Sequence, residues 1–297
     1  MVLSTMPMHS GPLDPMAMRQ AEEARVPPPE ERVPVASVTD VVLPSDYGGI
    51  PVRVYADRGS ATHGVIVYFH GGAFFLGSLN THDHVARSLA KETGCKVVSV
   101  GYRLAPENPF PAALDDCYGA VRWVAGAGGD ERGSDRRTLA LAGDSAGGNL
   151  VAAVVAIAHD DGLDAITHQI LYYPSFDLDF DAGRYVSLRE NAVGYGLETA
   201  MLKPDNAFYL GSGADPDDPR VSPIKRMDLS GLPPALILTG ELDPLRDEGE
   251  LYGQRLREAG VPATVIRYSG AGHGFVQHFS WIPEFGAAFA ETKEFLP

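Results

Sequence analysis

The chain has 297 residues and a formal net charge of −15. This length suits one large α/β domain with a modest insertion, or two small domains. An acidic surface of this strength repels phosphate backbones and anionic lipid headgroups, so we expect neither a nucleic acid nor a membrane as a partner. The only cysteines are Cys95 and Cys117. Two scattered cysteines form no disulfide framework, so we predict buried thiols in a cytoplasmic protein.

The N-terminal residues read MVLSTMPMHSGPLDPMAMRQ, which lacks a basic region followed by a continuous apolar run. We therefore predict no secretory signal. No apolar run elsewhere approaches the length of a membrane span. Residues up to about Val35 are rich in Pro, Met and Glu, and this composition predicts short helices or loops that end at the prolines 27–29.

From residue 37 onward, apolar stretches of strand length alternate with helical stretches. Expected strands cover residues 37–43, 50–56, 64–70, 95–102, 138–145, 168–174, 235–241 and 263–269. Expected helices cover residues 84–94, 110–126, 147–159, 245–260 and 283–296, with a turn at 46–49 and a loop at 128–135. Strands that are apolar along their whole length are typical of a parallel sheet buried on both faces. The sequence therefore predicts an α/β fold with a doubly wound, mostly parallel central sheet.

One region interrupts this alternation. Between Pro174 and Pro234 there is no clear strand, and Pro, Asp and Gly recur. A stretch of this length is too long for an ordinary loop inside an α/β domain, so we predict an inserted lid.

A candidate nucleophile lies in the segment Gly143-Asp144-Ser145-Ala146-Gly147-Gly148, between a predicted strand and a predicted helix. A serine at such a junction sits on a sharp turn, where small neighbours allow a strained backbone. The turn raises the hydroxyl at the carboxyl end of the sheet, and the N–H of Ala146 and the positive helix end point to the same place. We predict that Ser145 is a catalytic nucleophile.

A candidate oxyanion hole follows the strand at 64–70, in the segment His70-Gly71-Gly72-Ala73-Phe74. Attack on a carbonyl places negative charge on its oxygen, and backbone N–H groups without bulky side chains can stabilise that charge. We expect Gly71 to make the turn and the N–H groups of Gly72, Ala73 and Ala146 to be the donors. His70 is expected to hold the loop rather than act as a base.

A nucleophilic serine also needs a base to take its proton and a carboxylate to orient that base. Among the downstream histidines, only His273 lies in a flexible loop after a late strand; His159, His168 and His278 are interpreted as surface or packing residues. Asp243 follows the strand at 235–241 and is the predicted acid. Glu241 is the alternative.

Four blocks together resemble the bacterial hormone-sensitive-lipase-like esterases, a branch of the α/β-hydrolases. They are HGGAF at 70–74, YRLAPE at 102–107, GDSAGG at 143–148, and DPLRDEG at 243–249 with HGF at 273–275. The resemblance implies an α/β-hydrolase domain over residues 38–297 and a helical cap made of residues 1–37 and an insertion at about 176–232. It also implies hydrolysis of short acyl esters, often by homodimers. Ala73 departs from the family, many of whose members have a third glycine there.

The sequence thus predicts a serine carboxylesterase that acts on short-to-medium acyl esters. The same triad also serves deacetylases, lactonases and amidases, and a non-catalytic small-molecule binder is a further alternative. We expect no cofactor and no metal, because there is no phosphate-binding glycine loop and the run Asp177-x-Asp179-x-Asp181 does not complete a calcium loop. Aromatic residues that could line the substrate pocket are Phe74, Phe75, Tyr195, Phe208 and Tyr209.

Overall fold

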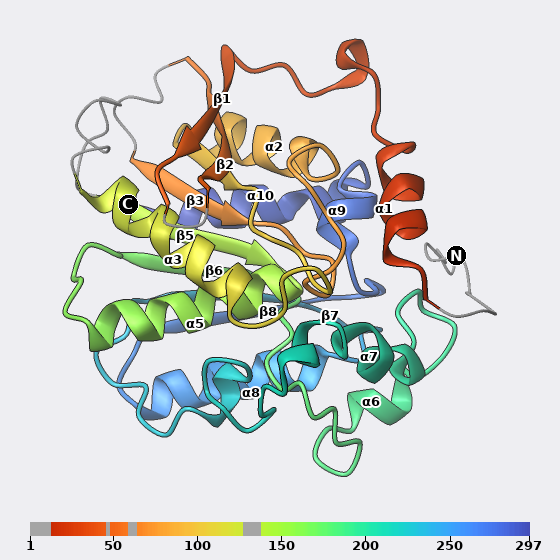
Figure 1. Ribbon diagram of the computed structural model, residues 1–297. Coiled ribbons are helices and arrows are strands. Elements are labelled where there is room, and N and C mark those ends of the chain that lie inside the picture. Colours follow the sequence, from red (N-terminus) through yellow and green to blue (C-terminus); the bar gives the residue numbers. More distant parts are fainter. Residues whose placement is uncertain (1–12, 46–47, 59–63, 127–137) are drawn as a thin grey trace.

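A central sheet of eight strands runs through the molecule and carries helices on both faces (Figure 1). The computed structural model describes residues 13–45, 48–58, 64–126 and 138–297. The strand order is β1-β2-β4-β3-β5-β6-β7-β8. The strands are β1 Ser37–Leu43, β2 Ile50–Ala56, β3 Val65–Phe69, β4 Lys96–Val100, β5 Leu139–Asp144, β6 His168–Tyr172, β7 Ala235–Gly240 and β8 Ala263–Tyr268.

The sheet is parallel from β4 to β8, while β2 pairs antiparallel with both β1 and β4. A short link joins β1 to β2, with Leu43 opposite Ile50, whereas a parallel pair needs a longer crossover connection. The predicted mostly parallel, doubly wound α/β fold is confirmed. The predicted loop at 128–135 lies outside the described residues, as does part of the turn at 46–49.

Helices lie on both faces of the sheet and beside the carboxyl ends of its strands (Figure 1). They are α1 Pro15–Glu23, α2 Asp83–Thr93, α3 Ala112–Ala125, α5 Ala146–Asp160, α6 Ser187–Glu190, α7 Thr199–Asn206, α8 Arg246–Glu258, α9 Phe275–Phe279 and α10 Pro283–Phe295. Helices α2, α9 and α10 pack together on one face, and α3, α5 and α8 lie on the other. Short 3₁₀ turns occur at Pro29–Glu31, Tyr209–Ser212 and Pro223–Lys225.

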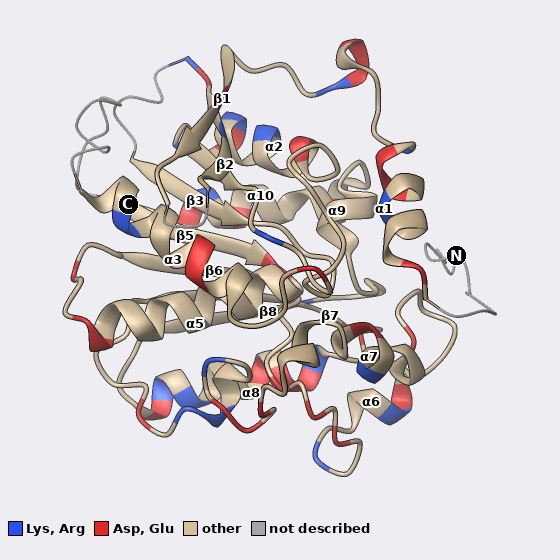
Figure 2. Cartoon of the chain, in the orientation of Figure 1, with Lys and Arg blue, Asp and Glu red and all other residues tan. Residues whose placement is uncertain are grey.

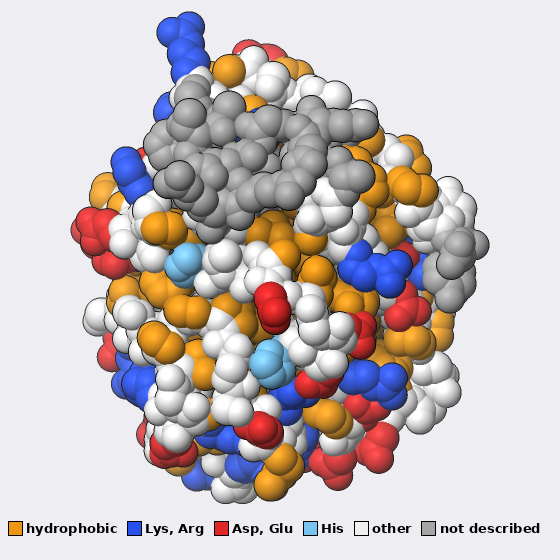
Figure 3. All heavy atoms as spheres, turned by 90° about the vertical axis from the view of Figure 1, so that its left-hand side faces the viewer, with side chains coloured by type: hydrophobic (Ala, Val, Ile, Leu, Met, Phe, Trp, Pro, Cys, Tyr) orange, Lys and Arg blue, Asp and Glu red, His pale blue; other side chains and the backbone are white. Residues whose placement is uncertain are grey.

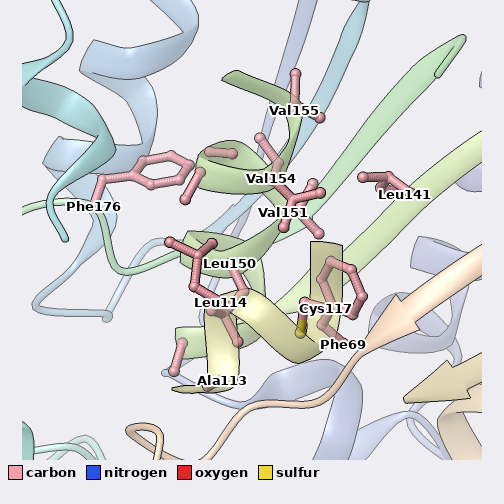
Figure 4. Packing of buried hydrophobic residues seen from close by; sticks show 14 of the residues in the cluster. Phe69, Ala113, Leu114, Cys117, Leu141, Leu150, Val151, Val154, Val155 and Phe176 are labelled. Carbon is pink, nitrogen blue, oxygen red and sulfur yellow. The ribbon is translucent and has the colours of Figure 1, made fainter. Parts of the chain in front are cut away.

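Alternate residues of each central strand enter two separate cores. In β3, Val67 and Phe69 belong to the core under α3 and α5, while Ile66 and Tyr68 belong to the core under α2 and α10. Figure 4 shows the first of these cores, where side chains of α5 pack between β5 and α3. Since both faces are covered, every residue of the strand is buried, which explains why the strand is apolar throughout.

Helix α1 begins at Pro15, with Asp14 accepting the N–H groups of Met16 and Ala17. It lies beside the segment that joins β6 to β7, which contains α6 and α7 (Figure 1). Arg19 anchors it to the α/β domain through the carbonyl oxygens of Phe75 and Ala105.

Charged side chains of both signs are mixed over the surface. Asp and Glu alternate with Lys and Arg around α6, α7 and α8 (Figure 2), and on the face in Figure 3 acidic, basic and apolar side chains are interspersed. Both cysteines, Cys95 and Cys117, are buried, as predicted. Among the described residues, no helix is both long and apolar enough to cross a membrane.

Candidate active site

Ser145 occupies the turn between β5 and α5. Its backbone has φ 53° and ψ −119°, a conformation that is strained for a residue with a side chain. Glycines on either side allow strand and helix to approach closely: a Cβ on Gly147 would lie 2.0 Å from the Phe69 carbonyl oxygen, and one on Gly143 would lie 2.4 Å from the Gly147 carbonyl oxygen. The G-x-S-x-G spacing therefore follows from packing, and it leaves the hydroxyl at the carboxyl end of the sheet.

His273 joins Ser145 to Asp243. Its Nε2 lies 2.9 Å from the Ser145 Oγ, and its Nδ1 lies 2.8 Å from the Asp243 Oδ2. Asp243 is fully buried, and its Oδ1 accepts the N–H of Leu245 at 2.8 Å. The structure thus brings together three side chains that lie far apart in the sequence. The alternative acid, Glu241, instead accepts the Ser269 hydroxyl and the Gly270 N–H.

The loop after β3 faces this row of hydrogen bonds. Gly71 donates its N–H to the Asp144 Oδ1 at 2.9 Å, so this group is already engaged. Gly72 and Ala73 follow with φ of 117° and 47°, and Ala146 is the first residue of α5. No hydrogen bond within the described part of the chain uses the N–H groups of Gly72, Ala73 or Ala146, and all three residues line the cavity that contains Ser145.

His70 lies behind this loop and is almost fully buried. Its Nδ1 lies 2.8 Å from the Gly71 carbonyl oxygen, and Tyr102 donates its hydroxyl to the His70 carbonyl oxygen at 2.7 Å. Tyr102 also stacks on the His70 ring at a centroid distance of 4.2 Å. Burial lowers the pKa of His70 to about 3, so its ring is neutral at physiological pH. These contacts indicate that His70 stabilises the loop after β3 rather than acting as a base.

Comparisons with known proteins identify the family. A family model described as α/β hydrolase fold matches residues 66–277. The chain is 38% identical over 244 residues to an arylesterase of Saccharolobus solfataricus, covering 82% of this chain and 78% of that protein. It is 41% identical over 265 residues to the carboxylic ester hydrolase LipN of Mycobacterium tuberculosis, covering 87% and 69%. The chain belongs to the α/β-hydrolase family.

The fold of this α/β-hydrolase also matches solved structures. A hyperthermophilic esterase from the archaeon Pyrobaculum calidifontis superposes with a TM-score of 0.87 and 41% identity, covering 95% of this chain and 92% of that one. The predicted resemblance to the hormone-sensitive-lipase-like branch is confirmed.

The cavity above Ser145 has a free volume of about 80 Å³. Residues from α1 and from the segment between β6 and β7 form part of its wall, among them Met18, Glu22, Leu197, Leu202, Asp205 and Asn206. No sequence motif marks these residues. Tyr173 also lines the cavity and packs edge-on against His273, with ring centroids 5.0 Å apart. Its position directly after β6 was the available signal, since sites in this fold lie at strand ends.

Of the five aromatic residues expected in the pocket, Phe75 lines the cavity. Phe74 and Tyr209 instead stack face to face in the core, with ring centroids 3.8 Å apart, and Phe208 packs behind Phe75. Tyr195 lies next to the His273 loop, where its carbonyl oxygen faces Gly272. None of these last four is among the cavity-lining residues of the described chain.

His278 was expected to be a surface or packing residue, but it lines the cavity. It lies in α9, and burial lowers its pKa to about 4, so its ring is neutral at physiological pH. In the described residues, no group of three or more His, Cys, Asp or Glu side chains is placed to hold a metal ion. Asp177 and Asp179 pair instead with Lys225, at 3.3 and 3.1 Å.

Proposed function

We propose that this protein is a serine carboxylesterase that hydrolyses short-to-medium acyl esters through an acyl-enzyme on Ser145. The observation that carries the proposal is the row of hydrogen bonds from Asp243 through His273 to Ser145. When Nδ1 donates to a carboxylate, Nε2 is left as an acceptor for the serine proton. The ester hydrolases and esterases among the similar proteins support an ester as the substrate.

In the proposed reaction, the Ser145 Oγ attacks the carbonyl carbon while the His273 Nε2 takes the hydroxyl proton. Asp243 orients the imidazole and stabilises its charged form. The N–H groups of Gly72, Ala73 and Ala146 stabilise the negative oxygen of the tetrahedral intermediate. His273 then gives the proton to the departing alcohol, and a water molecule repeats the sequence to release the acid and restore Ser145.

The test is hydrolysis of p-nitrophenyl esters from acetate to dodecanoate by the wild type and by Ser145→Ala. We expect turnover of the short esters and a loss of several orders of magnitude in kcat for the variant. An active Ser145→Ala would refute this nucleophile. A wild type that cleaves amides, lactones or acetylated sugars but no simple ester would make the protein one of the alternative hydrolases, and tight binding without turnover would make it a binder.

Two further expectations belong to the proposal. A cytoplasmic location is expected because two scattered cysteines form no disulfide framework. A homodimer is expected from the family resemblance, and sedimentation equilibrium of the purified protein would measure it.

A further inference from the structure

Two neighbouring side chains of α7, Asp205 and Asn206, line the same cavity as Ser145. Asn206 donates its Nδ2 to the Leu202 carbonyl oxygen at 2.8 Å, which fixes the amide orientation and leaves Oδ1 as an acceptor only. This Oδ1 and the Oδ1 of Asp205 are both buried and have no hydrogen-bond partner in the described part of the chain. The insertion therefore presents two adjacent acceptors and no donor to match them.

The other carboxylates of the cavity wall, unlike Asp205, accept hydrogen bonds from the described part of the chain. Glu22 accepts the N–H of Gly77 at 3.1 Å, and Asp144 accepts the N–H of Gly71 at 2.9 Å. Buried polar groups in proteins are almost always paired, so the unpaired Asp205 Oδ1 in this cavity is available to a hydrogen-bond donor on a bound molecule.

No Lys or Arg among the described residues lines the cavity beside Asp205. The titratable side chains that share the described cavity wall with Asp205 are Glu22, His82, Asp144, Tyr173, His273 and His278. Burial raises the pKa of Asp205 to about 6, so its carboxylate is still largely ionised at neutral pH.

We propose that Asp205, together with Asn206, recognises a hydrogen-bond donor on the substrate. The preferred substrates are then esters that carry a hydroxyl or ammonium group remote from the bond that is cleaved. This inference rests on the proposed esterase function and names its substrate class. It makes Asp205 a specificity-determining residue that contacts substrate away from the reacting atoms.

The experiment compares kcat/KM for three matched p-nitrophenyl esters: hexanoate, its ω-hydroxy analogue and its ω-amino analogue. A second set carries the same terminal groups on the alcohol side: the acetates of hexanol and of its ω-hydroxy and ω-amino analogues. Hydrolysis of these acetates is measured by the release of acetic acid. For the set that reaches Asp205, we expect the wild type to prefer both donor-bearing esters over the apolar one by roughly tenfold or more, mainly through a lower KM.

Two substitutions distinguish recognition of a hydroxyl group from recognition of an ammonium group. Asp205→Leu should abolish both preferences. Asp205→Asn keeps an acceptor oxygen but loses the charge, so it should retain part of the hydroxyl preference and lose the ammonium preference. The matched control is Asp215→Asn, since Asp215 lies in the same insertion and is exposed, and its carboxylate only accepts the N–H of Asp217. This control should keep both preferences.

The pH dependence provides an independent readout. The ratio of kcat/KM for the amino and apolar esters removes pH effects on the shared catalytic step, because both substrates need the same nucleophile and base. This ratio should fall as the pH is lowered through about 6, the pKa of Asp205. In Asp205→Asn the ratio should not change across that range.

The outcomes of the two proposals are distinguishable. If every variant hydrolyses the apolar esters but Asp205→Leu keeps the wild-type preferences, or the wild type shows none, the recognition proposal is wrong and the esterase function stands. If the wild type hydrolyses no ester, the esterase function fails. Calorimetry then measures the binding of the three esters to Ser145→Ala. Tighter binding of the donor-bearing esters supports recognition by Asp205, and equal binding of all three overturns it.

Discussion

The Asp144 Oδ1 accepts the backbone N–H of Gly71 at 2.9 Å, so the residue that precedes Ser145 also holds the loop that follows β3. The same oxygen accepts the Tyr68 hydroxyl at 2.5 Å. Burial opposes ionisation of Asp144, but the nearby His82 and these hydrogen bonds outweigh it and keep its pKa below the usual range. The proposed nucleophile and the proposed oxyanion donors are thereby fixed relative to each other.

Asp144→Ala is expected to lower kcat by about 10- to 100-fold with a smaller change in KM, because the loop that carries the Gly72 and Ala73 N–H groups loses its anchor. It should also cost about 3 kcal/mol of unfolding free energy, since Gly71 and Tyr68 lose their acceptor. Steady-state kinetics and urea unfolding measure both effects. Asp144→Asn, whose amide oxygen can still accept, should lose less of each; equal losses would contradict a positioning role.

Ser145 gives a test of backbone strain. Its φ of 53° suits glycine better than any residue with a Cβ. Both Ser145→Ala and Ser145→Gly lack the hydroxyl and should be inactive, but the glycine variant should be more stable than the alanine variant by about 1 kcal/mol. Urea unfolding of the two variants measures the difference. An alanine variant as stable as the glycine variant would show that the turn is not strained.

Asp243→Asn should lower kcat by about three to four orders of magnitude, because an amide at this position favours the wrong imidazole tautomer. The matched control is Glu241→Gln: Glu241 is bonded to Ser269 and Gly270 and does not contact His273. Its activity should stay within a few-fold of the wild type. The reverse order of effects, measured with p-nitrophenyl acetate, would make Glu241 the acid.

Arg19 is expected to control how α1 closes the cavity. It donates to the carbonyl oxygens of Phe75 and Ala105 and to the Glu107 carboxylate. Arg19→Ala should release α1, whose Met18 lines the cavity, and so raise KM for the longer esters by several-fold. Glu107→Ala removes only the half-exposed ion pair and should have little effect. Equal effects of the two variants on KM would refute the anchoring through the carbonyl groups.

The raised pKa of Asp205 should make its contribution to the stability of the fold depend on pH. Its folded-state pKa of about 6 lies above the ordinary value of 3.8, so between these values the folded state binds more protons than the unfolded state. The contribution of Asp205 to the unfolding free energy should therefore fall as the pH rises from about 4 to about 6, by up to about 3 kcal/mol. Asp205→Leu lacks this contribution. Its melting temperature relative to the wild type should rise across the window, and a constant difference would contradict the raised pKa.

The fold class and the candidate residues around Ser145 can be predicted from sequence patterns alone. Strands such as β3 are apolar at every position because both faces of the sheet are covered, and this regularity can be seen without coordinates. The glycines beside Ser145 are needed for local strand–helix packing, so they also appear as a short motif. The loop positions of Asp243 and His273 after late strands made them candidates before any distance was known.

Which side chains contact one another in the site depends on the tertiary structure. Only the fold brings the His273 ring within 3 Å of both Ser145 and Asp243, across sequence separations of 128 and 30 residues. It also decides that Phe74 and Tyr209 stack in the core while Asp205 reaches the cavity. An aromatic or acidic residue in an irregular segment has no periodicity that fixes its direction. Its environment is set by long-range packing of the insertion and α1 against the sheet, which no local pattern encodes.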